Sequence, residues 1–168
     1  MANLSDLLGR GVRSIQKVEI VNDIFSGTNN IYTIAPVNLS KSAVFVGSVG
    51  GVSAGYSSAV GHAALTSSTT LLARKHSNAY SSPCLQQVYV VDFGALVKSV
   101  QRGDMTASGD VAIAAVNPAK CIVTFYNSAP FSSGSDYVLR HTLTTTQLSV
   151  TRTDSSFVTT SWQVIEFY

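Results

Sequence analysis

The sequence is poor in charge and in long apolar runs. Of its 168 residues only 12% are charged, and the formal net charge is +2. That balance is too weak for a nucleic-acid interface, and Lys and Arg do not cluster among aromatic residues. The chain also lacks the apolar run of about 20 residues that spans a bilayer. Arg10 and Arg13 interrupt the only candidate signal peptide, so we expect a chain that is not exported, with no nucleic-acid partner and no membrane insertion.

Residue patterns that carry catalysis or bind metals are also missing. His62, His76 and His141 are not spaced as metal ligands. The glycine-rich stretch around Gly50 has no Lys-Ser or Lys-Thr after it, as a phosphate loop requires, and no serine lies in a Gly-x-Ser-x-Gly elbow. We therefore predict no catalytic residue, no metal site and no cofactor, and a protein that is not an enzyme.

What the sequence does contain is an internal repeat. Four blocks recur in the same order over the two halves. They are Val12–Lys17 and Val97–Arg102, Val37–Lys41 and Val116–Lys120, Leu65-Thr66 with Arg74 and Leu143-Thr144 with Arg152, and Val90–Phe93 and Val164–Phe167. The repeat predicts an all-β fold with two tandem, duplicated antiparallel β-sandwich domains over 12–93 and 97–168. The alternative is one continuous β-sandwich whose strands only look alike.

Short runs rich in β-branched and aromatic residues predict about six strands in each half. The expected strands are 12–21, 30–36, 42–47, 61–65, 69–75 and 86–93, then 97–103, 110–115, 121–126, 137–143, 147–153 and 159–167. Halves of about 80 residues bury little surface alone, so they should lean on each other or on neighbouring subunits. The short linker Gly94–Leu96 favours a fixed pair.

An N-terminal arm over residues 1–11 precedes the first repeat. Leu4, Leu7 and Leu8 have the spacing of one helical face, which predicts a short helix. So short a helix is not stable alone. It either latches onto this chain's own β-structure or anchors on a neighbouring protein, and we keep both alternatives open.

Positions that are apolar in both copies predict the core. Side chains alternate between the two faces of a strand, so matched apolar residues at every second position should point inward. The predicted core residues are Val44, Val46 and Val90 in the first half and Val123, Phe125, Trp162 and Val164 in the second.

Other positions predict contact surfaces. Phe45 is aromatic where its counterpart Thr124 is polar, which indicates an interface between halves or subunits. The closing strands are apolar on both faces and need cover on both, which predicts oligomerisation. Tyr56 and Tyr137 lie in or beside the two long polar loops, which are the tips expected to touch a partner.

Matched charges predict two structural ion pairs. Arg74 and Arg152 lie on the fifth predicted strand of each half, and Asp92 and Glu166 on the sixth. We predict Arg74 with Asp92 and Arg152 with Glu166, each fixing strand register through a bidentate hydrogen bond. A ligand site is the less favoured interpretation. Cys84 and Cys121 lie at unmatched positions, so we expect free thiols rather than a repeated disulfide.

The second half resembles a family of small tailed-bacteriophage proteins. The resemblance rests on Ser99–Gly103 (Ser-Val-Gln-Arg-Gly), Ile113–Lys120, Val150–Arg152 and Ser161–Phe167 (Ser-Trp-Gln-Val-Ile-Glu-Phe). The first half is a degenerate copy, with Lys17 in place of the arginine and Val88-Tyr89 in place of Trp-Gln. The resemblance implies a virion component assembled in the host cytoplasm, and it supplies no catalytic or ligand residues.

Three functional classes follow. The leading one is a structural virion protein that forms a symmetric oligomer on the tail (tip, fibre or collar) or head, as a trimer or a pseudo-hexameric ring in contact with other virion proteins. The alternatives within the virion are a module that binds a host receptor or surface glycan and a capsid decoration protein. An enzyme is the third class and would require a pocket with convergent titratable groups.

Overall fold

The computed structural model describes residues 11–22, 30–51, 61–75, 84–127, 139–152 and 160–168, and these residues form a β-rich fold as predicted. All twelve predicted strand segments overlap an observed strand. The predicted N-terminal helix, with Leu4, Leu7 and Leu8, lies outside the described residues. The elements are β1 (Ser14–Asn22), β2 (Asn30–Thr33), η1 (Leu39–Lys41), β3 (Ser42–Gly51), β4 (Gly61–Ser67), β5 (Thr70–Lys75), β6 (Cys84–Asp92), β7 (Val97–Met105), β8 (Gly109–Ala112), η2 (Pro118–Lys120), β9 (Cys121–Asn127), β10 (Leu139–Leu143), β11 (Gln147–Arg152) and β12 (Thr160–Phe167).

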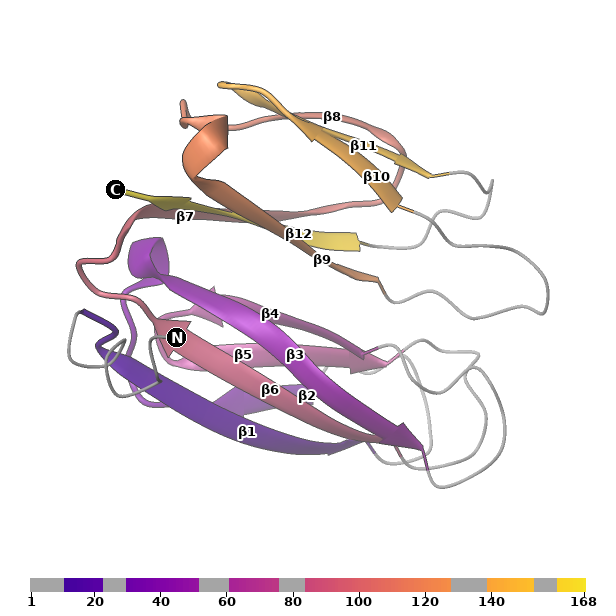
Figure 1. Ribbon diagram of the computed structural model, residues 1–168. Coiled ribbons are helices and arrows are strands. Elements are labelled where there is room, and N and C mark those ends of the chain that lie inside the picture. Colours follow the sequence, from indigo (N-terminus) through magenta and orange to yellow (C-terminus); the bar gives the residue numbers. More distant parts are fainter. Residues whose placement is uncertain (1–10, 23–29, 52–60, 76–83, 128–138, 153–159) are drawn as a thin grey trace.

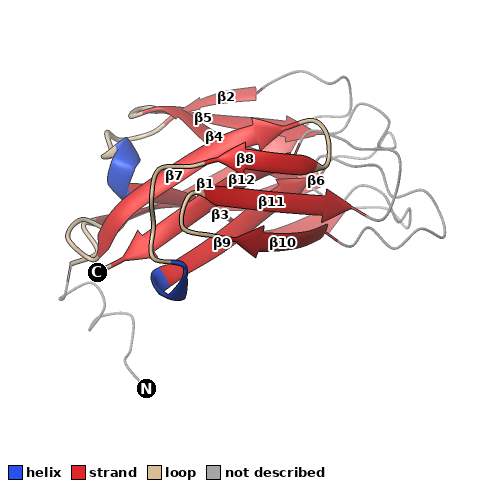
Figure 2. Ribbon diagram, turned by 90° about the horizontal axis from the view of Figure 1, so that it is seen from above, coloured by secondary structure: helices blue, strands red, loops and turns tan. Residues whose placement is uncertain are grey.

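The strands form four antiparallel sheets of three strands each. In the first half the orders are β1-β6-β3 and β2-β5-β4, and in the second they are β7-β12-β9 and β8-β11-β10. Adding six to each strand number of the first half gives the order of the second. The first six strands lie in the lower part of Figure 1 and the last six in the upper part. Figure 2 looks down on the second half, where β8, β11 and β10 lie over β7, β12 and β9.

The pairing register repeats together with the strand order. Val90 on the central strand of the first half lies opposite Gln16 and Val44. Val164 in the second half lies opposite Gln101 and Val123. These positions are the ones that the sequence blocks match, so the repeated sequence corresponds to repeated pairing.

Each half has its own apolar core between its two sheets. In the first half, Val44 and Val90 pack with Leu71 and Ala73 of the facing sheet. In the second half, Trp162 and Val164 pack with Leu148 and Val150, and Val123 and Phe125 pack against them. The third strand's Val46 is partly buried against the first cluster. Every residue that the sequence predicts as core therefore lies in or against one of these two clusters.

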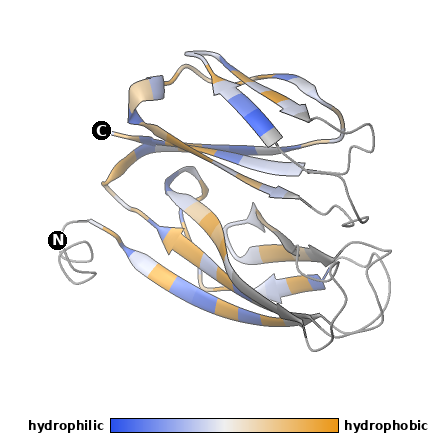
Figure 3. Cartoon of the chain, turned by 45° about the vertical axis from the view of Figure 1, so that its right-hand side comes forward, coloured by the Kyte–Doolittle hydropathy of each residue, from blue (hydrophilic) through white to orange (hydrophobic). Residues whose placement is uncertain are grey.

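Polar and apolar residues alternate along β1, as the hydropathy colours of Figure 3 show. Val18 and Ile20 point toward the core of the first half, whereas Lys17 and Glu19 are exposed on the outer face. Ile15 breaks the pattern, because it lies on the outer face and is 40% exposed. A single exposed isoleucine is normal on a protein surface and by itself indicates no contact.

A glutamine on the first strand of each half fixes the segment that follows the second strand. The Gln16 amide donates to the carbonyl of Ala35 (2.9 Å) and accepts from its N–H (2.8 Å). Gln101 makes the same two bonds to Ala114, at 3.0 and 2.7 Å. A side-chain amide can replace a neighbouring strand in this way because it has one donor and one acceptor side by side.

An asparagine caps the short 3-10 helix of each half. The Asn38 side chain accepts from the Ser40 N–H at the start of η1, and the Asn117 side chain accepts from the Ala119 N–H at the start of η2, both at 3.1 Å. Asparagine is favoured at such caps because its side-chain oxygen satisfies a free backbone donor. The sequence block Val-Asn-x-x-Lys is therefore a capped turn.

Two volume exchanges distinguish the halves. In the second half Gly103 lies opposite Trp162, and a Cβ on Gly103 would lie 2.7 Å from the indole ring. The corresponding pair in the first half is Val18 and Val88. Similarly, Gly47 lies under Tyr89, with 2.8 Å from an added Cβ to the ring, whereas its counterpart Tyr126 is itself the aromatic residue. In both cases a larger side chain on one strand accompanies a smaller one on its neighbour, which keeps the packing volume of the site.

Strand pairing corrects one part of the sequence alignment. Thr70 begins β5 opposite Thr33, and Gln147 begins β11 opposite Ala112, which gives an offset of 77 positions along these strands. Lys75, rather than Arg74, therefore aligns with Arg152. The match of the two arginines was wrong because the first half has an extra residue at the irregularity between Leu65 and Ser67.

Candidate functional site: the junction between the two halves

The two halves meet through an apolar cluster distinct from their own cores. Its buried members are Ala43 of β3 and Val97, Val100 and Ile165 of the second half. Three phenylalanines pack around them: the Phe45 and Phe93 rings lie edge to face with centroids 6.2 Å apart, and those of Phe93 and Phe167 lie 6.0 Å apart. Phe93 directly precedes the linker, so the junction begins where the first half ends. The second apolar face of β12 is covered here by the first half.

Polar side chains of the second half bind the outer edge of β3, which is the edge that does not pair with β6. The Gln163 amide accepts from the Val44 N–H (2.9 Å) and donates to the Val44 carbonyl (2.8 Å). The Tyr126 hydroxyl also donates to that carbonyl (3.0 Å) and accepts from the Val46 N–H (3.2 Å). Burial raises the pKa of the Tyr126 phenol, which keeps it protonated and able to donate. An edge strand that would otherwise be open to pairing is thus closed within the chain.

Two cations complete the contact. The Arg102 guanidinium donates to the carbonyls of Leu39 (2.6 Å) and Ser42 (2.5 Å), at the two ends of η1. In the opposite direction, the Lys41 ammonium donates to the carbonyls of Val97 (2.7 Å) and Lys98 (2.9 Å). The two cations therefore satisfy carbonyls that helix and strand ends leave without a partner.

The contact has a definite polarity. The first half contributes an edge, made of β3, η1 and the neighbouring β4, whereas the second contributes a face, made of β7 and β12 with Tyr126 of β9. We call these surfaces the edge and the face below. Figure 1 shows the two halves one above the other; η1 contacts β7, and β4 contacts β9 and β12.

A cleft of about 200 Å³ lies beside this contact, between β4 and β5 on one side and β7 and β12 on the other. Ser161 donates to Asp104 on its wall. The part of the chain that the structure describes holds no group of three or more His, Cys, Asp and Glu side chains placed to bind a metal. The cleft is lined by Ala63, Ala64, Leu65, Thr66, Leu72, Arg102, Gly103, Asp104, Ser161, Trp162 and Gln163.

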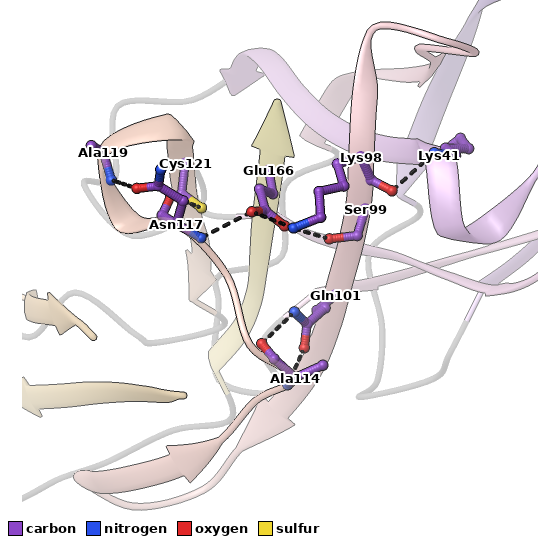
Figure 4. Close-up of polar contacts among 9 residues, drawn as sticks. All are labelled: Lys41, Lys98, Ser99, Gln101, Ala114, Asn117, Ala119, Cys121 and Glu166. Atoms are coloured by element: carbon purple, nitrogen blue, oxygen red, sulfur yellow. Dashed lines mark hydrogen bonds and ion pairs between the residues drawn. The ribbon is translucent and has the colours of Figure 1, made fainter. Parts of the chain in front are cut away.

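Glu166 of β12 is a buried carboxylate, and its contacts are drawn in Figure 4. It accepts from the Asn117 N–H (2.9 Å), from Lys98 (3.0 Å) and from the Ser99 hydroxyl (3.4 Å). These contacts, with the Asn117 bond first among them, hold the pKa of the Glu166 carboxyl below its ordinary value against the opposing effect of burial. Glu166 thus joins β12 to the cap of η2 and to β7.

Asp92 has the corresponding place in the first half. It accepts from the N–H of Asn38 (3.3 Å) and of Gly94 (3.0 Å), and Arg13 lies 4.0 Å from it. Gly94 has φ +54° and a Cβ there would lie 2.6 Å from the Gly11 carbonyl, so glycine is required at the start of the linker. The carboxylate therefore anchors the turn that leads into the second half.

The predicted ion pairs are not the contacts seen at these carboxylates. Lys98 and Arg13, on the first strand of each half or directly before it, are the observed cations. Arg74 belongs to the sheet β2-β5-β4, while Asp92 belongs to β1-β6-β3. The side chains of Arg74 and Arg152 lie outside the described part, so the pairing itself stays a prediction.

Of the other residues predicted to form contacts, one lies in the junction and the rest lie outside the described residues. Phe45 lies in the junction, where it packs on Phe93. Leu4, Leu7, Leu8, Tyr56 and Tyr137 lie outside the described residues. Of the two cysteines, Cys121 is a free thiol, and its Sγ donates to the Asn117 carbonyl at 3.2 Å. Ser42 makes the equivalent bond to Asn38, at 2.7 Å.

Sequence reasoning missed the four polar residues that carry the junction: Lys41, Arg102, Tyr126 and Gln163. The signal that selected Phe45 was a change of character between the copies. That signal is also present at Gln163, which corresponds to Tyr89, and at Tyr126, which corresponds to Gly47. The same comparison selects both residues when it is made at each position whose side chain points outward from the sheets β1-β6-β3 and β7-β12-β9.

Comparison with protein-family models, with curated proteins and with solved structures finds no match. Within the described residues, no helix is long and apolar enough to cross a membrane.

Proposed function

We propose that this chain is a non-enzymatic structural component of a tailed-phage virion, built of two tandem, duplicated β-sandwich domains. The observation that supports the duplication is the repeated strand order, 1-6-3 with 2-5-4 in each half. Paired hydrogen bonds at Gln16 and Gln101, and paired caps at Asn38 and Asn117, support it at the level of single residues. Independent convergence on the same register and the same contacts is a weaker explanation than duplication.

The virion assignment rests on the resemblance of Ser99–Gly103 and Ser161–Phe167 to small tailed-phage proteins. The junction is consistent with a structural task. The Gln163 amide and Nη2 of Arg102 bind backbone groups of the first half and so hold two domains together. A device that fixes the angle between two like domains suits a part that must present the same surface repeatedly.

We propose a symmetric oligomer as the working form, with a trimer favoured. Three chains of two like domains form a pseudo-hexameric ring, which matches three-fold and six-fold neighbours in a virion. The position on the tail or on the head surface is the part of this proposal that experiment must decide.

The experiment is to locate the chain in purified particles. Gold-labelled antibody against the chain, viewed by electron microscopy, should label one site on every particle, and quantitative mass spectrometry should give a copy number divisible by three. Absence from washed particles would overturn the assignment. Label over the head lattice would favour the capsid decoration alternative.

The receptor-binding alternative is favoured by the polar loops around Tyr56 and Tyr137. It requires the purified chain to bind host cells or isolated surface glycans and to compete with particle adsorption. A structural part should do neither, so the same purified protein separates the two functions.

A further inference from the structure

Two exposed isoleucines lie on corresponding sheets of the two halves, β1-β6-β3 and β7-β12-β9. Ile15 of β1 is 40% exposed and Ile122 of β9 is 51% exposed. Strand register matches Ile15 with Val100 and Ile122 with Ala43. Both counterparts are buried in the junction, at 8% and 0% exposure. Each half thus exposes an apolar residue where the other half buries one.

These two positions belong to opposite sides of the junction. Ala43 is part of the edge of the first half, so Ile122 marks the corresponding edge of the second. Val100 is part of the face of the second half, so Ile15 marks the corresponding face of the first. Within one chain the first half uses its edge and the second uses its face. The face of the first half and the edge of the second half remain unused, and they are the same two kinds of surface that bind each other within the chain.

The cations follow the same pattern. Lys41, which bridges to the carbonyls of Val97 and Lys98, corresponds to the exposed Lys120. Arg102, which donates to carbonyls around η1, corresponds to Lys17. Lys17 pairs with Glu19 (2.7 Å), and both side chains are exposed. An exposed pair of this kind contributes little to stability, so Lys17 is available for a second partner at small cost.

The backbone of β9 also directs hydrogen-bonding groups away from its own sheet, at the position that corresponds to Val44 of β3. The Val44 N–H and carbonyl point away from β6, because Gln163 binds them from the other side. Val123 pairs with β12 in the same register, so its N–H and carbonyl point away from β12. Tyr89, the counterpart of Gln163, lies on the free face of the first half. Its hydroxyl donates to Gln87 at 3.2 Å and retains lone pairs that can accept from such an N–H.

We propose that the free face of the first half, around Ile15, Lys17 and Tyr89, binds the free edge of the second half, around Lys120 and Ile122, of another copy of this chain. The contact repeats the geometry of the intramolecular junction, and it is heterologous: each copy uses one surface for the neighbour before it and the other for the neighbour after it. This inference deepens the proposed function, on which it rests for its biological role, by naming the surfaces that join the subunits. A set of such contacts closes into a ring, or extends as a filament if the rotation does not close.

The test uses the purified full-length chain and three variants. Ile15→Glu places a charge on the free face, Ile122→Glu places one on the free edge, and Ile31→Glu is the matched control. Ile31 is 70% exposed and lies on β2, at the edge of its sheet opposite to β4, the strand of that sheet that contacts β9 and β12. Mass photometry and analytical ultracentrifugation give the size of each species, and circular dichroism with thermal melting shows that each variant folds.

We expect the unmodified chain and Ile31→Glu to form the same oligomer. Ile15→Glu and Ile122→Glu should each weaken association by at least about tenfold, because a charge is then desolvated at the centre of the contact. A mixture of these two variants should form a one-to-one dimer that grows no further, because each still has one intact surface and the two intact surfaces are complementary. A dimer of this composition is the signature of a heterologous contact.

The proposal is overturned if the unmodified chain is a monomer at its highest soluble concentration. It is also overturned if folded Ile15→Glu and Ile122→Glu assemble like the unmodified chain, or if their mixture stays monomeric while each alone fails to assemble. These outcomes leave the virion assignment standing, since a chain located in particles by antibody could be held there by other proteins. Conversely, an oligomer of the expected kind that is absent from particles would refute the assignment and leave this contact intact.

Discussion

The side chain of Gln163 binds the backbone of Val44, 119 residues away, with the two hydrogen bonds that a neighbouring β-strand would make. Gln163 is 4% exposed, so both bonds form out of water. The contact explains how one half recognises the edge of the other without extending its sheet. The stability of the junction should therefore depend on the amide group of this one side chain.

Replacing Gln163 with Ala should cost about 1–3 kcal/mol of unfolding free energy, because a buried N–H and a buried carbonyl of Val44 lose a partner. Chemical denaturation of the purified chain measures this cost. Gln101→Ala is the matched control: it removes the same two bonds, here to Ala114, at an exposed site. Equal losses from the two variants would contradict the role we give to burial.

Ile165→Ala should loosen the junction while leaving both cores intact. Ile165 is fully buried and packs with Ala43, Val97 and Val100 between the halves. We expect a loss of about 2–5 kcal/mol and a calorimetric transition that broadens or divides as the halves unfold separately. Val164→Ala, one residue earlier and inside the second core, should lower stability without that change in shape. A single sharp transition for Ile165→Ala would show that the halves do not unfold independently.

Gly103→Val should destabilise the second half, because its Cβ would lie 2.7 Å from the indole ring of Trp162. Trp162→Val should also destabilise it by about 3–5 kcal/mol, by leaving a cavity. The double variant recreates the Val18 and Val88 pair of the first half. Its loss should be smaller than the sum of the two by about 0.5–3 kcal/mol, as a double-mutant cycle measures. Strict additivity would mean that the two residues do not share one volume.

Stability should depend on the ionisation of Glu166. Its pKa is lower in the folded chain than in the unfolded one, so its contribution is present in full above the ordinary carboxyl value and is lost as the pH falls through the folded value. Denaturation between neutral and acidic pH should show this loss, and Glu166→Gln should reduce the pH dependence. Lys98→Met should keep most of it, because the Asn117 N–H is the main cause of the shift. If Lys98→Met flattened the profile as much as Glu166→Gln, the ion pair would be the main cause instead.

The sequence predicted the strands and the core well because both depend on local patterns. Val44 and Val123 are apolar at matched positions, and burial follows from the period of two along a strand. Repetition doubled this information, since each position was seen twice. The repeated asparagines and glutamines, which cap turns and bind loops, lay within the same blocks.

The junction was harder to predict because its parts do not repeat. Arg102, Gln163 and Tyr126 act on the first half alone, and their counterparts Lys17, Tyr89 and Gly47 have different chemistry. The partner of Glu166 was missed for another reason. Lys98 lies on β7 beside Ser99, which is the strand partner of Glu166. The sequence pattern instead predicted a partner on the fifth strand, which belongs to the other sheet.

The exchange of volume between Gly103 with Trp162 and Val18 with Val88 has a consequence for how this chain can change. A crossover between the two repeats that joined β1 of the first half to β12 of the second would press Val18 against the indole ring, and the reverse crossover would leave a void beside Val88. Either hybrid would fold poorly. The two halves are thus not interchangeable in packing, and under the proposed duplication a recombination between them would lower the stability of the product.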